Sequence, residues 1–211
     1  LNQIQAGLSD IGFRGAFYPM LSSGGTASVH TASTVPVQLV ESGPAAGAMA
    51  AAYFGERSGR SDLISFDMGG TTAKMCLIKD GQPAKGNTFE VARVHRFKKG
   101  SGLPIRVPTI EMIEIGAGGG SIAHLDEMGL LKVGPESAGA DPGPACYGLG
   151  GTSPTVTDAD ALLGYLNPDY FLGGRMSLDI AQAERAMQGL ADALGMSVTD
   201  AAHGVYQVVN E

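Results

Sequence analysis

A carboxylate followed by two glycines, at the end of an apolar strand, constrains this chain more than any other feature of its sequence. Residues 67–72 read Asp-Met-Gly-Gly-Thr-Thr and lie between the largely apolar runs 63–66 and 73–78. The pair Asp80 and Gly81 then forms a turn dipeptide. The segment predicts a strand, a tight polar turn and a returning strand, which favours an antiparallel meander.

The turn at 67–72 has the composition of a phosphate-binding loop. Because glycine has no Cβ, the backbone N–H groups of Gly69 and Gly70 can approach a phosphate closely, and Thr71 and Thr72 can add hydroxyl donors. Asp67 can hold a hydrated Mg²⁺ ion or orient a water molecule. The alternative is an ordinary hairpin turn, in which Gly-Gly is common. The pattern alone leaves both interpretations open.

A second glycine run, Gly-Ala-Gly-Gly-Gly-Ser, occupies residues 116–121. It does not match the dinucleotide-binding fingerprint, because Ser121 stands where the third glycine belongs and a hairpin, rather than a helix, is expected after it. A flexible turn or a point of close packing is one interpretation. The other is a glycine-lined wall against a ligand, formed by Gly118, Gly119, Gly120 and Ser121.

Composition excludes several classes of protein. The chain has 14 Lys and Arg against 21 Asp and Glu, a net charge of -7, which is opposite to the basic surface of a nucleic-acid binder. No apolar run approaches the roughly 20 residues that span a bilayer, and no signal peptide is evident. We therefore expect a cytoplasmic protein with reduced thiols at Cys76 and Cys146. The four histidines lack the spacing of zinc ligands.

Glycine is unusually abundant, with 32 of 211 residues against about 7% in average proteins, so we expect turns and loops to make up much of the structure. The apolar residues between them predict strands at 14–21, 88–98 and 105–115 and a hairpin around residues 127–129. We expect polar turns at 22–26 and a long irregular loop at 134–154.

Helices are predicted from capping residues and apolar spacing. One begins at Pro44 and runs to about Arg57, with Gly59 beyond its end. Another is predicted over 158–166, where Thr157 and Asp160 have the spacing of a capping box. Asp158 and Asp160 are then capping residues rather than a catalytic pair. The apolar stripe expected for the first helix comprises Ala46, Met49, Ala50, Tyr53 and Phe54, and two later helices begin after Asp179 and Ser197.

Several segments, taken in order, resemble the central part of the hydantoinase A/oxoprolinase family. The similarity extends over nearly the whole chain and includes both glycine-rich segments. The first residue is Leu1 rather than Met, and the chain stops at Glu211 inside an apolar helical pattern, so we expect a central fragment of a longer polypeptide. The matching segments are residues 42–47, 67–72, 115–123, 133–140, 142–148 and 154–159.

The resemblance implies an α/β fold of the actin-like and sugar-kinase-like ATPases, with a mixed sheet, of which this chain is one half. On that basis residues 1–60 are expected to form an N-terminal strand and a linking helix. Residues 61–211 are expected to form the second ATPase-type domain, truncated at both ends.

The resemblance also implies ATP and Mg²⁺ as cofactors and a cyclic amide, such as a hydantoin or 5-oxoproline, as substrate. ATP phosphorylates the amide oxygen, and a hydantoinase B-type partner completes ring opening; an oligomer is expected. Asp67 is then the catalytic and metal-binding residue, and the isolated chain is expected to be inactive. The residues expected to contact the nucleotide or line its cleft are Gly69, Gly70, Thr71, Thr72, Gly118, Gly119, Gly120 and Ser121.

Two other functions remain open. The same resemblance extends to ATP-using subunits of ketone carboxylases, which depend on bicarbonate. An actin-like domain whose nucleotide controls assembly, without catalysis, is the third possibility. One position departs from the family pattern, because Lys74 stands where many members have an acid, and it is expected to face phosphate or solvent.

Overall fold

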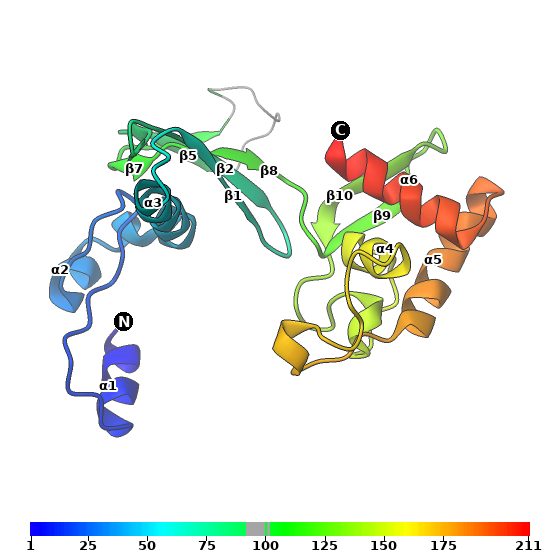
Figure 1. Ribbon diagram of the computed structural model, residues 1–211, viewed down its shortest axis with the longest axis horizontal. Coiled ribbons are helices and arrows are strands. Elements are labelled where there is room, and N and C mark those ends of the chain that lie inside the picture. The colour runs from blue at the N-terminus through cyan, green and yellow to red at the C-terminus, as the bar shows by residue number, and fades with distance from the viewer. Residues whose placement is uncertain (92–99, 101) are drawn as a thin grey trace. The chain divides into compact units, whose positions relative to one another are not determined.

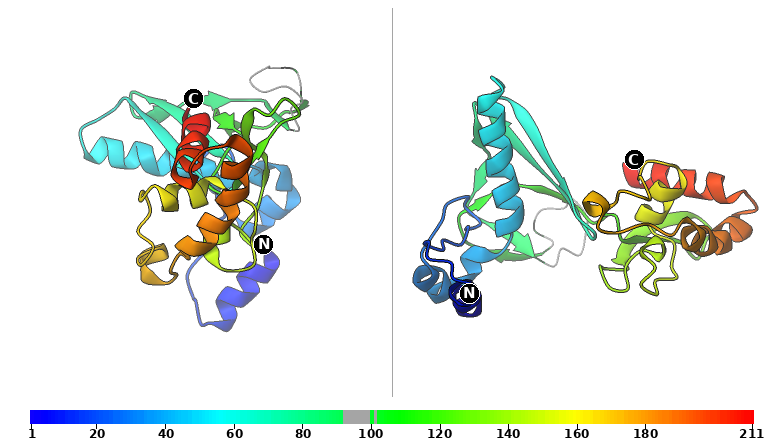
Figure 2. Two further views of the ribbon diagram at one scale, coloured as in Figure 1. Left: turned by 90° about the vertical axis from the view of Figure 1, so that its right-hand side faces the viewer. Right: turned by 60° about the horizontal axis from the view of Figure 1, so that its bottom comes forward.

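The computed structural model describes residues 1–91, 100 and 102–211, and the chain divides into two compact units (Figures 1 and 2). Unit 1 comprises Leu1–Asp67 and Lys74–Ile113, and unit 2 comprises Met68–Ala73 and Glu114–Glu211. The chain therefore enters unit 2 briefly at the turn after Asp67, returns to unit 1, and enters unit 2 again at Glu114. The division expected at residue 60 concerns the domains of a larger protein and stays a prediction.

Unit 1 begins with helices rather than with the strand predicted at 14–21. That prediction was wrong: Gly15 and Pro19 interrupt the segment, and only Met20 forms a β-bridge, with Thr26. The polar turn at 22–26 is confirmed, since the Leu21 N–H donates to the Gly25 carbonyl at 2.7 Å. The helical elements are α1 (Asn2–Asp10), α2 (Val29–Thr34), η1 (Pro36–Leu39) and α3 (Ser42–Arg57).

Helix α3 confirms the predicted helix but not its predicted stripe. Tyr53 and Phe54 are 53% and 65% exposed, and the buried side is made of the smallest residues. A Cβ at Gly55 would collide with the Leu63 side chain, so the missing side chain lets the helix approach the adjoining strand. The buried residues of α3 are Ala45, Ala48, Ala52 and Gly55.

The sheet of unit 1 confirms the predicted strand, turn and returning strand. The strands run in the order β1 (Leu63–Met68), β2 (Ala73–Lys79) and β3 (Gln82–Pro83), and β8 (Ile113–Ile115) also pairs with β2. Strands β2 and β3 are antiparallel, with Ile78 opposite Pro83. The core beneath them joins Cys76, Ile78 and Ile110 to the buried alanines of α3.

Short strands replace the two longer ones predicted between residues 88 and 115. Strand β5 (Phe89–Val91) lies within the first, and residues 92–98 of that prediction fall outside the described residues. The second is broken after Ile105, because Pro108 has no N–H for a strand ladder. The pairs are β4 (Lys85–Gly86) with β7 (Thr109–Ile110), and β5 with β6 (Leu103–Ile105), both antiparallel.

Unit 2 packs a hairpin against helices. Strands β9 (Ser121–Leu125) and β10 (Leu131–Ser137) form the predicted antiparallel hairpin, whose turn is closed by the Asp126 carboxylate accepting the N–H groups of Met128 and Leu130. The loop that follows is irregular, as predicted, apart from η2 (Ala145–Tyr147). The remaining elements are α4 (Val156–Leu162), η3 (Leu172–Gly174), α5 (Ile180–Leu194) and α6 (Val198–Asn210).

The helix starts of unit 2 differ from the prediction at one place. Helix α4 begins two residues early because Thr155, not Thr157, is its N-cap, and Asp158 completes the capping box. Asp179 and Ser197 cap α5 and α6 as predicted. The helices bury Val156, Ala159, Met187, Leu190 and Val205 against Ala123 and Val133 of the hairpin, and this cluster is the core of unit 2. The units together show a mixed α/β fold, in agreement with the expected class.

Across the residues described, no helix combines the length and the apolar character needed to cross a lipid bilayer.

Candidate phosphate-binding loop

The turn between β1 and β2 is a tight, exposed loop. The Gly69 N–H donates to the Thr72 carbonyl at 2.9 Å, which closes the turn. Gly69, Gly70 and Thr71 are exposed, whereas Thr72 is half-buried. We call residues 69–72 the phosphate loop; all of them belong to unit 2.

The second glycine run holds the phosphate loop by its carbonyl groups. The Gly119 N–H donates to the Gly69 carbonyl at 3.0 Å, and the Gly120 N–H donates to the Gly70 carbonyl at 2.6 Å. The Ser137 hydroxyl on β10 donates to the same Gly70 carbonyl at 3.3 Å. These contacts link two segments that are about fifty residues apart in the sequence.

The carbonyl contacts fix the direction of the loop's N–H groups. In a trans peptide the C=O and the following N–H point in opposite directions. Because the carbonyls of Gly69 and Gly70 face the second glycine run, the N–H groups of Gly70 and Thr71 face away from it. Within the described residues neither N–H group donates to another residue. Successive outward N–H groups of this kind form an anion-binding concavity.

Close approach of the two loops requires glycine at particular positions. A Cβ on Gly118 would lie 2.5 Å from the Gly69 carbonyl oxygen, and one on Gly120 would lie 2.9 Å from that of Gly70. Both distances are shorter than real contacts, and the opposing atoms are backbone, which cannot move aside cheaply. By contrast, a Cβ on Gly70 would meet nothing within 4 Å, in agreement with open space on that side of the loop.

The structure therefore brings the predicted residues of the two glycine runs together and shows how they are arranged. The N–H groups of Gly119 and Gly120 are used by the phosphate loop, and Ser121 is fully buried, with its hydroxyl accepting the Gly118 N–H at 2.9 Å. These residues support the phosphate loop from behind. Their expected role as a wall of the nucleotide or substrate cleft stays a prediction.

Sequence reasoning did not identify Thr157 as part of this arrangement. Both its N–H and its hydroxyl donate to the Gly119 carbonyl, each at 2.8 Å. The sequence predicts Thr157 as a helix cap, whereas the cap is Thr155. The signal that points to Thr155 is the spacing to Asp158, three residues later, which is the spacing of a capping box.

Asp158 directly follows Thr157 in the chain and is fully buried. Its carboxylate accepts the N–H groups of Ala145 and Cys146, at 3.2 and 2.7 Å, and both the N–H and the hydroxyl of Thr155, at 3.0 and 2.7 Å. A buried carboxylate is stable only with such donors. Asp158 therefore joins the start of α4 to η2, and the predicted capping role of this residue is confirmed.

Asp67 is exposed on β1, in unit 1. Its carboxylate borders α3, since a Cβ added at Gly47 would lie 3.8 Å from Oδ2. Among the described residues no three His, Cys, Asp or Glu side chains form a cluster that could hold a metal ion. An exposed carboxylate of this kind fits Mg²⁺, which binds through one or two carboxylates together with phosphate oxygens and water.

Lys74 lies immediately after the phosphate loop, on β2. The expectation that it faces solvent is not met, because its side chain is 14% exposed and its Nζ lies 3.5 Å from Oε2 of Glu41. The alternative, that it faces phosphate, stays a prediction. Glu41 directly precedes α3, and both residues belong to unit 1.

Cys146 is fully buried and close to the Asp158 carboxylate. Burial, followed by the negative charge of Asp158, raises the pKa of the Cys146 thiol far above its usual range. A catalytic thiol needs the opposite environment, one that favours the thiolate. The surroundings of Cys146 therefore favour a structural role over a catalytic one.

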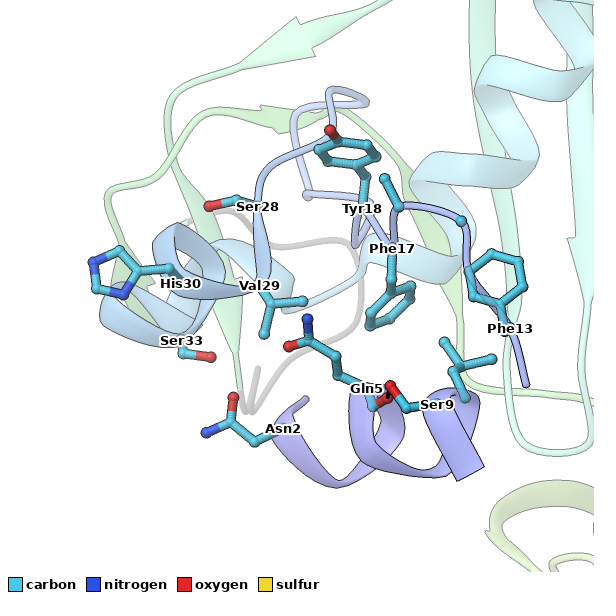
Figure 3. A pocket seen from close by; sticks show the side chains of 13 residues that line it. Asn2, Gln5, Ser9, Phe13, Phe17, Tyr18, Ser28, Val29, His30 and Ser33 are labelled. Atoms are coloured by element: carbon cyan, nitrogen blue, oxygen red, sulfur yellow. Dashed lines mark hydrogen bonds between the residues drawn. The ribbon is translucent and has the colours of Figure 1, made fainter. Parts of the chain in front are cut away.

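A cavity of about 530 Å³ lies in unit 1, between α1 and the segment that contains α2 (Figure 3). In Figure 3 the side chains of Gln5 and Phe17 face each other across it, whereas the imidazole of His30 points outward. None of its lining residues is Lys, Arg, Asp or Glu, and α1 contributes no buried residue. The cavity therefore offers no lysine or arginine side chain to a phosphate.

Comparisons with known proteins agree with the resemblance described above. The hydantoinase/oxoprolinase family model matches residues 1–211. An uncharacterized protein of Methanocaldococcus jannaschii is 48% identical over 96% of this chain and 30% of its own length. The acetophenone carboxylase gamma subunit of Aromatoleum aromaticum is 40% identical over 95% of this chain and 26% of its own. The caprolactamase subunit alpha of Pseudomonas jessenii is 39% identical over the whole chain and 29% of its own.

Solved structures give the same result. A nucleotide-free structure of acetone carboxylase matches 99% of this chain over 28% of the acetone carboxylase chain, with a TM-score of 0.85 and 33% identity. The structure of the ATP-dependent caprolactamase of Pseudomonas jessenii matches 99% of this chain over 29% of the caprolactamase chain, with a TM-score of 0.71 and 39% identity. The chain spans at most about a third of the length of these relatives. Full coverage by the family model, together with these identities, shows that the chain belongs to the hydantoinase/oxoprolinase family.

Proposed function

We propose that this chain provides a phosphate-binding loop to an ATP-dependent enzyme that activates a cyclic amide for ring opening. The observation that carries the proposal is the pair of N–H groups on Gly70 and Thr71. Both point away from the glycine run that holds their loop, and both are without an acceptor in the described part of the chain. Groups fixed in this way bind an anion without having to reorganise.

The residues next to Gly70 in the chain fit a nucleoside triphosphate with Mg²⁺. The exposed hydroxyl-bearing Thr71 lies beside the outward N–H groups, and Asp67 lies two residues before Gly69 in the chain. In this proposal Gly70 and Thr71 bind phosphate oxygens, Thr72 supports the turn, and Asp67 holds the metal ion or orients water. Bound ATP would supply the phosphoryl group that converts the poorly reactive amide oxygen into part of a good leaving group.

The cyclic amide is proposed from the relatives. The caprolactamase relative is named for a lactam, and its solved structure is described as ATP-dependent. Lactams and hydantoins share a ring amide, whose carbonyl carbon is a weak electrophile. Because this chain covers only part of those proteins, we place the contacts that select the substrate in further parts of a longer protein. The actin-like arrangement of two ATPase domains belongs to the same proposal.

A ketone carboxylase subunit is the second candidate. It is supported by the TM-score of 0.85 against acetone carboxylase and by the 40% identity to an acetophenone carboxylase subunit. The phosphate loop serves both reactions equally well, since each begins by activating a carbonyl or bicarbonate oxygen. The relatives named as subunits also lead us to propose a partner, of the hydantoinase B type, and an oligomeric assembly.

The test is phosphate release by the full-length subunit together with its partner, in the presence of ATP and Mg²⁺. Separate assays contain caprolactam, 5-oxoproline, hydantoin, or a ketone with bicarbonate. Stimulation by a cyclic amide without bicarbonate would support the proposal, and stimulation only by ketone with bicarbonate would favour the carboxylase. Nucleotide-dependent assembly without stimulated phosphate release would contradict both enzymatic functions.

A pair of variants tests the metal-binding residue. Asp67→Asn removes the charge from the residue that we place on Mg²⁺, and we expect phosphate release to fall at least a hundredfold. Asp62→Asn is the matched control, because Asp62 is also exposed, lies just before β1, and accepts the Asp80 N–H through an oxygen that asparagine retains. Equal activity of the Asp67 and Asp62 variants would contradict the assignment.

A further inference from the structure

We propose that Thr157 is a positioning residue of the phosphate loop and acts through the backbone of Gly119 and Gly120. This inference rests on the proposed function of that loop. Thr157 belongs to α4, is 7% exposed, and all of the residues involved lie in unit 2. It is not placed to contact the nucleotide itself.

The contacts form a continuous chain of hydrogen bonds. The N–H and hydroxyl of Thr157 both donate to the Gly119 carbonyl, each at 2.8 Å. The same peptide group carries the Gly120 N–H, which donates to the Gly70 carbonyl at 2.6 Å. The peptide group of that carbonyl carries the Thr71 N–H, which points outward. The chain therefore begins at α4 and ends at a group that we place on phosphate.

Such a chain affects both the geometry and the strength of the final donor. Two donors on one carbonyl occupy both of its lone pairs and fix the plane of the Gly119–Gly120 peptide. Hydrogen bonds in series also polarise one another, so that each N–H becomes a better donor when its own carbonyl accepts. Loss of the Thr157 hydroxyl should therefore weaken the Thr71 N–H as an anion donor, although the two groups do not touch.

Thr157 does not cap its own helix. Thr155 and Asp158 form the capping box of α4. Because Thr157 lies in the first turn of the helix, its N–H has no acceptor within the helix. The helix is also a rigid support, since Val156 and Ala159 are buried in the core and Asp158 is held by several donors. Gly119 must be glycine for the contact, because a Cβ there would lie 2.7 Å from the Thr157 hydroxyl.

The test compares three variants of the full-length subunit. Thr157→Val removes the hydroxyl but keeps the branched shape and the backbone N–H, and Thr157→Ser restores the hydroxyl. Thr109→Val is the matched control, because Thr109 in unit 1 is 6% exposed and also donates its hydroxyl to a backbone carbonyl, that of Ile110. The readouts are the dissociation constant for ADP with Mg²⁺, measured by calorimetry, and backbone hydrogen exchange without nucleotide.

We expect Thr157→Val to weaken ADP binding about threefold to tenfold, the effect of one neutral hydrogen bond, and to speed exchange in peptides containing residues 118–121. Thr157→Ser should restore both to within about twofold, and Thr109→Val should change neither. In a subunit that binds ADP, unchanged binding or unchanged exchange in Thr157→Val would overturn the positioning role alone. Failure of the unaltered subunit to bind any adenine nucleotide would overturn the proposed function and this inference together.

Discussion

Lys74 and Glu41 form an ion pair, with 3.5 Å between Nζ and Oε2, that joins the second residue of β2 to the residue preceding α3. The Lys74 side chain is 14% exposed and that of Glu41 is 35% exposed, so the pair is only partly screened by water. Glu41 adopts a left-handed conformation, with φ of 61°, at the helix start. The pair therefore fixes a sharp change of chain direction next to the strand that leaves the phosphate loop.

Replacing Glu41 with glutamine should destabilise this contact by about 1 kcal/mol, because the largely buried Lys74 ammonium group loses its attraction to the Glu41 charge. A loss of that size corresponds to about fivefold faster hydrogen exchange if β2 opens locally. The measurement is exchange in peptides of β2 in the full-length subunit. The double variant Glu41→Gln with Lys74→Met tests the coupling, and strictly additive effects of the two substitutions would contradict it.

Gly118→Ala should separate the two glycine-rich loops. Its Cβ would lie 2.5 Å from the Gly69 carbonyl oxygen, so the carbonyl contacts of the phosphate loop must lengthen. We expect at least tenfold weaker ADP binding, measured by calorimetry on the full-length subunit. Gly43→Ala is the control, because a Cβ at Gly43 would meet nothing within 4 Å. Equal affinity of the two variants would show that the close approach of the loops does not matter for binding.

The phosphate loop shows which parts of such a site a sequence reveals. The strand and turn at residues 63–78 were predictable, because apolar runs and a Gly-Gly pair are local signals. The outward direction of the Gly70 and Thr71 N–H groups was not, since it depends on hydrogen bonds from Gly119 and Gly120. Those contacts join segments about fifty residues apart, and nothing local in either segment encodes them.

The helices show the same division between local and tertiary signals. Asp179 and Ser197 cap their helices as predicted, because capping is decided within a few residues. The sequence predicts an α3 stripe that includes Tyr53 and Phe54, yet both are exposed. The buried residues are instead Ala45, Ala48, Ala52 and Gly55. Helical spacing gives the period of a stripe, but the distance to the packed sheet decides whether small or large side chains face it.

Cys146 should be inert toward alkylation in the folded protein. Its thiol has a raised pKa, first because of burial and second because of the Asp158 charge, so the reactive thiolate is scarce at neutral pH. The folded state also loses stability above pH 9, the usual thiol value, because there the unfolded chain ionises while the folded thiol keeps its proton. Iodoacetamide labelling at pH 8, read by mass spectrometry, should modify Cys146 only after denaturant is added. Rapid labelling without denaturant would contradict this environment.

Asp160 should reduce stability at neutral pH. Burial raises the pKa of this carboxyl group, so the folded state disfavours the charge that the unfolded chain carries freely. The folded state gains from this group only while the carboxyl is protonated, and that gain is lost as the pH rises through the raised value. Asp160→Asn keeps the shape without the charge, and it should stabilise the protein at pH 7 by less than about 1 kcal/mol.

The stabilising effect of Asp160→Asn should disappear as the pH falls below 3.8, the usual value for aspartate, where both states hold the proton. The measurement is the apparent melting temperature of the full-length subunit across this range. Asp169→Asn is the control, because Asp169 is exposed in the same unit and carries no comparable burial cost. A gain at pH 7 that persists unchanged at low pH, or one of equal size at Asp169, would show that burial of the Asp160 charge is not its cause.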